Sequence, residues 1–195
     1  MAKAGDIGCL LIDDPLYGGG GLDDLRDALI RQDIRTERFT RDRSGPLHPS
    51  MQRAYQRVRR DGAVNAIIAM GAGCDCALAL SCQLPADRLV LLEPMNWNGV
   101  GESAREMKRV RAFARRNAAF CVADVLILPG PHTEAGHLKR LLRALTGCRV
   151  AALQSTEELW TNRKEVLNLG IIHFLREGVV TKSLAENHEM CIIYG

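Results

Sequence analysis

Short unbroken apolar runs alternate with helical patterns along this chain, and this alternation constrains the fold more than any other feature. The runs lie at 7–12, 63–70, 88–93, 124–128 and 149–154, and residues 35–40 form a weaker, more exposed predicted strand. Most of them lack polar alternation, which is typical of strands buried on both faces of a sheet. Strands that alternate with helices form right-handed β-α-β units. We therefore predict an α/β fold with one doubly wound, mostly parallel sheet of about six strands and helices on both faces.

The composition favours one globular domain in the cytoplasm. The chain has 195 residues, of which 47% are hydrophobic, enough for a single domain with a real core. No apolar run reaches the roughly 20 residues of a membrane span, and no secretory signal opens the sequence. The seven cysteines are an odd number, which predicts free thiols. The net charge of +3 is too small to indicate a nucleic acid partner.

We expect neither a cofactor nor a metal ion. The pair Gly71-x-Gly73 lacks the third glycine of a dinucleotide fingerprint and follows a late strand instead of the first. No Gly-Lys-Ser or Gly-Lys-Thr follows a glycine run, which excludes a P-loop. Cys74-x-Cys76 alone supplies too few ligands, at the wrong spacing, for a structural zinc ion.

Three unusual loops follow predicted strands. They are the four glycines at 18–21, the small-residue turn at 71–76 and the loop at 129–134. Parallel α/β sheets bind ligands at the carboxyl ends of their strands, so these loops form the predicted binding region. Consecutive glycines lose much conformational entropy on folding, which favours their close approach to a ligand or to another backbone segment.

The order of these loops resembles the α/β-hydrolase superfamily, in its small form without a large lid domain. The resemblance covers residues 7–178. Residues 66–80 are similar to the family's strand, nucleophile elbow and helix, 88–94 to the next strand, and 164–178 to the terminal helix. The glycine run is similar to the oxyanion loop. The resemblance therefore implies oxyanion or ligand contacts from Tyr17, Gly18, Gly19 and Asp75.

The resemblance leaves two registers for the elbow. This turn is tight, so small residues must flank the nucleophile. If Cys74 is the nucleophile, the flanking residues are Ala72 and Cys76, which fit. If Gly73 takes that place, Asp75 falls on a position that should be small. We favour Cys74, as in the dienelactone hydrolases, and a helix N-terminus favours its thiolate. The alternative is that Cys74 only fills a tight turn.

The rest of the triad is incomplete. In the family an acid follows the strand matched by 124–128, and Glu134 is the nearest candidate, with His132 beside it. The family's histidine should follow the strand at 149–154, where this chain has Ser-Thr-Glu-Glu. A cysteine without a paired base lacks the general base of triad chemistry. The carboxylate of Asp75 would also oppose a developing oxyanion.

Two functions remain open. In the first, the protein has a degenerate triad and binds a small acyl or carboxylate ligand, or a partner, without ordinary triad turnover. In the second, it is an active hydrolase of small esters, thioesters or lactones. Its catalytic residues would then be Cys74, His132 and Glu134, with backbone oxyanion donors near Gly18 and Asp75.

The C-terminal tail is assigned separately. We place the hydrolase-like domain at 1–178 and the tail at 179–195. The tail ends in the apolar segment 190–194. An apolar terminus seldom stays free in water, so we expect it to pack on the body of the domain or on a partner subunit in a homo-oligomer.

Overall fold

One seven-stranded sheet forms the centre of the computed structural model, which describes residues 6–13, 21–39, 47–96, 101–117, 121, 123–145, 147–155, 163–181 and 188–194. The strand order is β2-β1-β3-β4-β5-β6-β7. The strands are β1 (Ile7–Ile12), β2 (Arg35–Phe39), β3 (Val64–Met70), β4 (Arg88–Leu92), β5 (Asp124–Leu128), β6 (Arg149–Ser155) and β7 (His188–Tyr194). The first six are parallel and β7 is antiparallel to β6. The predicted doubly wound, mostly parallel sheet is confirmed.

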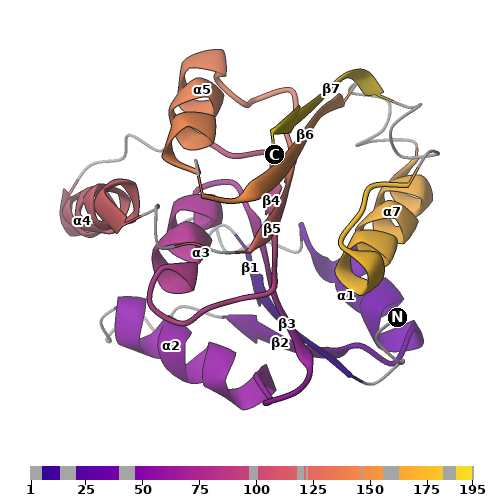
Figure 1. Cartoon of the computed structure of the whole chain (residues 1–195). Coiled ribbons are helices and arrows are strands. Elements are labelled where there is room, and N and C mark those ends of the chain that lie inside the picture. Colours follow the sequence, from indigo (N-terminus) through magenta and orange to yellow (C-terminus); the bar gives the residue numbers. More distant parts are fainter. Residues whose placement is uncertain are drawn as a thin grey trace.

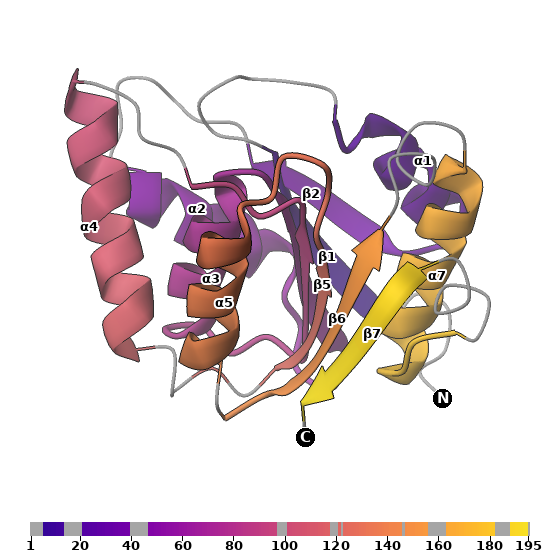
Figure 2. The same ribbon diagram turned by 90° about the horizontal axis from the view of Figure 1, so that it is seen from above.

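Helices cover both faces of the sheet (Figures 1 and 2). They are α1 (Asp23–Arg31), α2 (Leu47–Val58), α3 (Gly73–Ser81), α4 (Gly101–Asn117), α5 (Ala135–Ala144) and α7 (Lys164–Glu177). Helices α1 and α7 pack on one face, while α2, α3 and α5 pack on the other. Helix α4 lies outside α3, farther from the sheet.

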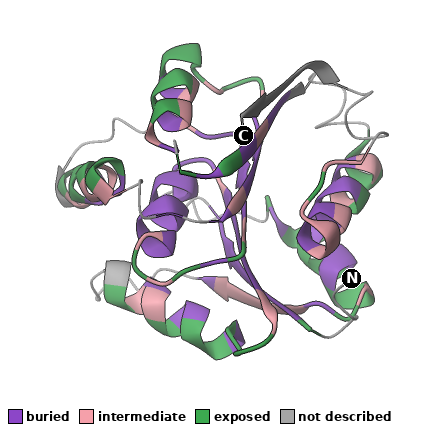
Figure 3. Ribbon diagram, viewed as in Figure 1, coloured by how far each residue is buried: buried purple, intermediate pink, exposed green. Residues whose placement is uncertain are grey.

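Two apolar clusters hold these layers together, one on each face of the sheet. The larger joins β1, β3, β4 and β5 to α2–α5, and the smaller joins the opposite faces of the same strands to α1 and α7. Helix α3 is the most enclosed helix, since all nine of its residues are buried, whereas much of α4 faces solvent (Figure 3). The loop into α3 is therefore built into the core.

Two elements differ from the sequence prediction. Helix α3 begins at Gly73, whereas its apolar pattern predicted a start at residue 77. The helical backbone thus continues through residues that the sequence presents as a loop. Part of the tail, 188–194, adds β7 to the sheet by pairing with β6. None of the helices in the described part of the chain is long and apolar enough to cross a bilayer.

Candidate functional site

A sharp strand-to-helix turn lies at the carboxyl end of β3, and its apex is Gly71. The residue has φ +59°, a backbone conformation that favours glycine. Its N–H donates to the carbonyl oxygen of Leu92 (3.0 Å), and its own carbonyl accepts from the N–H groups of Cys74 and Met95 (3.3 Å each). Both registers of the sequence analysis therefore place the apex too late, because Gly73 and Cys74 already belong to α3.

The sequence did contain a pattern that marks this apex. Ala69 and Gly73 lie two positions before and after Gly71. Small residues at those two positions are what a nucleophile elbow requires. An added Cβ at Gly73 would lie 2.8 Å from the carbonyl oxygen of Ile12, so the start of α3 packs directly on the end of β1. Gly71 therefore occupies the place that a nucleophile would take in such a turn.

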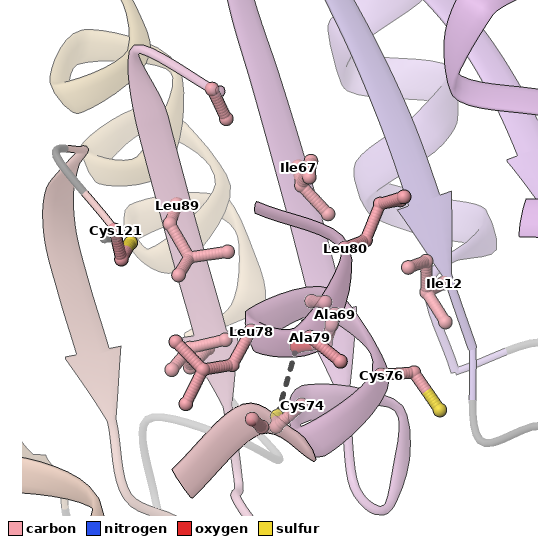
Figure 4. Packing of buried hydrophobic residues seen from close by; sticks show 14 of the residues in the cluster. Ile12, Ile67, Ala69, Cys74, Cys76, Leu78, Ala79, Leu80, Leu89 and Cys121 are labelled. Atoms are coloured by element: carbon pink, nitrogen blue, oxygen red, sulfur yellow. Dashed lines mark hydrogen bonds between the residues drawn. The ribbon is translucent and has the colours of Figure 1, made fainter. Parts of the chain in front are cut away.

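Cys74 lies three residues beyond this apex and faces the interior. Its side chain is 1% exposed, and its Sγ lies 3.5 Å from the carbonyl oxygens of both Ala69 and Leu92. Figure 4 shows the contact to Ala69 within the apolar cluster. A sulfur atom in this position packs against the sheet and is not presented to a substrate. The catalytic role of Cys74 stays a prediction, and this geometry favours the packing interpretation.

Asp75 points toward α4. Its carboxylate is 5% exposed and accepts a 2.6 Å hydrogen bond from Nε of Arg111. His137 of α5, 3% exposed, belongs to the same charged cluster. Burial lowers the pKa of His137; Asp75 opposes this shift, and Arg111, Arg140 and Arg115 reinforce it. The charge of Asp75 is thus compensated between three helices. Its backbone N–H stays the predicted oxyanion donor.

His132 and Glu134 lie in the turn before α5, and both side chains are exposed. Glu134 is the N-cap residue of α5, although its side chain makes no capping bond. The backbone N–H of His132 donates to Oε1 of Glu93 (3.1 Å). The thiol of Cys74 donates to carbonyl oxygens in the core, whereas His132 contacts Glu93 through its backbone N–H. Their triad roles also stay predictions.

Glu93 is a candidate residue that sequence reasoning missed. It directly follows β4, is only 9% exposed and has φ +45°, which is rare outside glycine. Strain of this kind concentrates at functional sites. The side chain lies against Gly130, where an added Cβ would be 2.8 Å from the Glu93 Cδ atom. An acid directly after a buried apolar strand was the pattern that could have identified it.

Asp13 is a second buried acid, at the carboxyl end of β1. It is 7% exposed and forms an ion pair with Arg38 of β2. Burial raises its pKa, and the charge of Arg38 opposes that shift. Because β1 and β4 flank β3, the two acids follow the strands on either side of Gly71. The sequence analysis assigned no ligand-binding role to Asp13.

The glycine loop is described only at its end. Tyr17, Gly18 and Gly19, the predicted oxyanion-loop residues, lie outside the described residues. An added Cβ at Gly21 would lie 2.7 Å from Sδ of Met70. The chain therefore enters α1 beside the end of β3, next to the elbow.

Comparison with solved structures identifies the fold. A structure titled for two metagenome-derived lipolytic enzymes, LipS and LipT, matches with a TM-score of 0.68 and 12% identity, over 90% of this chain and 96% of that chain. An esterase domain from Rhodothermus marinus matches with a TM-score of 0.63 and 11% identity, over 89% and 88%. An enol-lactonase from Burkholderia xenovorans matches with a TM-score of 0.58 and 12% identity, over 88% and 92%.

These likenesses show the α/β-hydrolase fold, as the sequence resemblance predicted. At this level of identity they show the fold alone. No family model and no curated protein matches the sequence. The activity of this chain must therefore be argued from its own residues.

Proposed function

We propose that this chain, which has the α/β-hydrolase fold, is a degenerate member of that group of structures. It would bind a small acyl or carboxylate ligand at the elbow, without ordinary triad turnover. The observation that carries the proposal is the glycine at position 71, at the apex of the turn. A nucleophilic enzyme of this kind needs a side-chain oxygen or sulfur at that apex, and glycine supplies neither.

Binding can survive this loss of the nucleophile. The backbone turn is retained, and α3 starts two residues after its apex. The N-terminus of a helix carries partial positive charge, which favours the oxygen of a carbonyl or carboxylate group. The structural neighbours are lipolytic enzymes, an esterase and an enol-lactonase. The substrates of enzymes of these kinds contain acyl groups. An acyl or carboxylate ligand is therefore the class that we propose.

The competing hypothesis is an active acyl hydrolase that uses Cys74. The intact strand-turn-helix geometry is the observation in its favour. It requires the buried thiol to leave its contacts with the carbonyl oxygens of Ala69 and Leu92 and turn toward the ligand. His132 would serve as the base, with Glu134 as the acid.

Both hypotheses are tested on the full chain with p-nitrophenyl butyrate as substrate and butyrate as ligand. The degenerate protein should hydrolyse the ester at the background rate and should bind butyrate saturably in calorimetry. Saturable turnover that disappears in Cys74→Ala would overturn the proposal and establish the hydrolase. An absence of both turnover and butyrate binding would overturn the acyl-ligand assignment.

The elbow is probed with Gly71→Ala, for which the chain offers a matched control. Gly62 also has positive φ (+77°), but an added Cβ there meets nothing within 4 Å. Each substitution forces alanine into left-handed backbone, at a cost of about 1–2 kcal/mol. Only Gly71→Ala adds a methyl group at the apex. We expect it alone to weaken butyrate binding, by about tenfold or more, a change that corresponds to about 1.4 kcal/mol. Equal binding by both variants would place the ligand elsewhere.

A further inference from the structure

Three cysteines meet at the edge of the sheet opposite the elbow. Cys82 follows the last residue of α3, Cys121 precedes β5, and Cys148 precedes β6. All three are free thiols in this structure. Cys121 lies in the apolar cluster at the opposite end from Cys74 (Figure 4). The proposed ligand site does not involve them, so their arrangement needs a separate explanation.

The contact between Cys121 and Cys148 is the closest in this group. The thiol of Cys148 lies 3.1 Å from the carbonyl oxygen of Cys121, to which it donates. The hydroxyl oxygen of Ser81 lies 3.5 Å from Sγ of Cys121. Cys121 is 0% exposed and Cys148 is 7% exposed, whereas Cys82 is partly exposed and reaches the edge of the cluster. Two thiols are therefore held side by side with a third nearby.

A metal site is not the explanation for this cluster. In the part of the chain that the structure describes, no three His, Cys, Asp or Glu side chains could together hold a metal ion. Besides binding a metal ion, two adjacent thiols can be oxidised to a disulfide. Disulfide formation needs two sulfur atoms whose backbones are already close. Cys121 lies three residues before β5 and Cys148 one residue before β6, two strands that pair from Asp124 and Arg149 onward, and the Cys148 thiol already contacts the backbone of Cys121.

We propose that Cys121 and Cys148 form a redox pair that closes to a disulfide when a hydroperoxide oxidises the protein. The two residues are 27 positions apart in the sequence, so the bond would tie together the two ends of the segment that contains β5 and α5. It would lie at the amino-terminal edge of the sheet, away from the elbow. The modification therefore acts on the scaffold and leaves the ligand-binding turn unobstructed.

The reaction balances with one hydroperoxide molecule. One thiol of the pair loses its proton and attacks one peroxide oxygen; an S–O bond forms and the O–O bond breaks, which leaves a sulfenic acid, and the released alkoxide or hydroxide takes the proton to become an alcohol or water. The second thiol then attacks the sulfenic acid sulfur; the S–S bond forms, the S–O bond breaks, and the hydroxide that leaves takes the proton of the second thiol to become water. The two thiols together lose two electrons, and the peroxide gains them.

The contact between the two residues also shifts their pKa values in opposite directions. A hydrogen bond from the Cys148 side chain lowers the pKa of Cys121, against the opposing effect of burial. The same contact, followed by burial, raises the pKa of Cys148. Burial also raises the pKa of Cys82 to about 12. These shifts favour ionisation of Cys121 over Cys148 and Cys82, and the thiolate is the reactive form of a cysteine.

The test oxidises the reduced full chain with hydrogen peroxide, alkylates the remaining thiols in denaturant and maps the peptides by mass spectrometry without reduction. We expect a peptide that joins Cys121 to Cys148, with the loss of two alkylated thiols per chain. Dithiothreitol should restore both thiols. Because this readout uses the unaltered protein, the result does not depend on the folding of any variant.

Variants then assign the bond. Cys121→Ser and Cys148→Ser should each abolish the cross-linked peptide, whereas Cys9→Ser should retain it. Cys9 is the matched control because it is equally buried but lies in β1, within the other apolar cluster. Three results would overturn the proposal: no thiol lost in the folded protein, a bond from Cys82 instead of Cys148, or a bond formed only between chains. None of these results bears on the elbow.

Discussion

Two helical glycines should respond in opposite ways to the same substitution. Gly73 is the first residue of α3, and Gly136 is the second residue of α5. Replacing glycine by alanine where the backbone suits both stabilises a protein by about 0.4–1 kcal/mol, because the unfolded chain loses conformational freedom. This gain should apply to both positions. The surroundings of the added methyl group then decide the sign.

The structure gives the two methyl groups very different neighbours. At Gly136 the nearest atom is a nitrogen of the flexible Arg140 side chain, 3.7 Å away. At Gly73 the nearest atoms are the backbone oxygens of Ile12 (2.8 Å) and Asp13 (3.0 Å), which cannot move without displacing the end of β1. Overpacking of this kind costs about 1–3 kcal/mol. We therefore expect Gly73→Ala to lose about 1–2 kcal/mol and Gly136→Ala to gain about 0.5 kcal/mol.

Urea unfolding of both variants and the unaltered protein, followed by circular dichroism, measures these differences. The midpoint should fall for Gly73→Ala and rise for Gly136→Ala, with slopes unchanged. A Gly73→Ala protein that is as stable as Gly136→Ala would refute the reasoning. It would mean that the start of α3 does not pack directly on β1, and the geometry of the elbow would then be wrong.

Two further predictions concern the charged cluster around Asp75. Arg111→Met should cost about 3 kcal/mol of unfolding free energy because it leaves a buried carboxylate without its partner, whereas Arg57→Met, which breaks an exposed pair with Glu37, should cost less than about 1 kcal/mol. Equal losses in urea unfolding would contradict the burial of the first pair. Burial holds the pKa of His137 below its usual range, so the unfolded chain binds this proton more tightly. Stability should therefore fall as pH drops below about 6.5, and His137→Gln should reduce that fall in thermal melts. An unchanged profile would exclude His137 as its source.

The architecture was predictable because each core strand carries its own local pattern. The segments 7–12 and 125–128 carry no polar side chain, which is typical of a strand covered on both faces of the sheet. Strand β7 was harder to predict. The apolar residues at 190–194 require burial, but their local pattern is compatible with a helix, a strand or a subunit interface. In the structure this segment is a strand that pairs with β6.

The candidate site was predictable in its place but not in its details. The small residues at 71–76 predicted a tight turn after β3, and the structure has one at Gly71. The spacing of the small residues Ala69, Gly71 and Gly73 predicts the apex more accurately than the position of the Cys74 thiol does. For Glu93 the sequence shows an acid directly after an apolar strand, but its positive φ and its contact with Gly130 are known only from the structure.

The sequence by itself determined the order of strands and helices and the edge of the sheet where the tight turn after β3 lies. These properties depend on hydrophobic periodicity and on residues that are neighbours in the sequence, and both can be read from the sequence itself. Only the tertiary structure decided that Cys74 faces the core, that Asp75 pairs with Arg111, and that Cys121 meets Cys148. The last two contacts join residues 36 and 27 positions apart, and the packing of separate elements against one another brings such residues together.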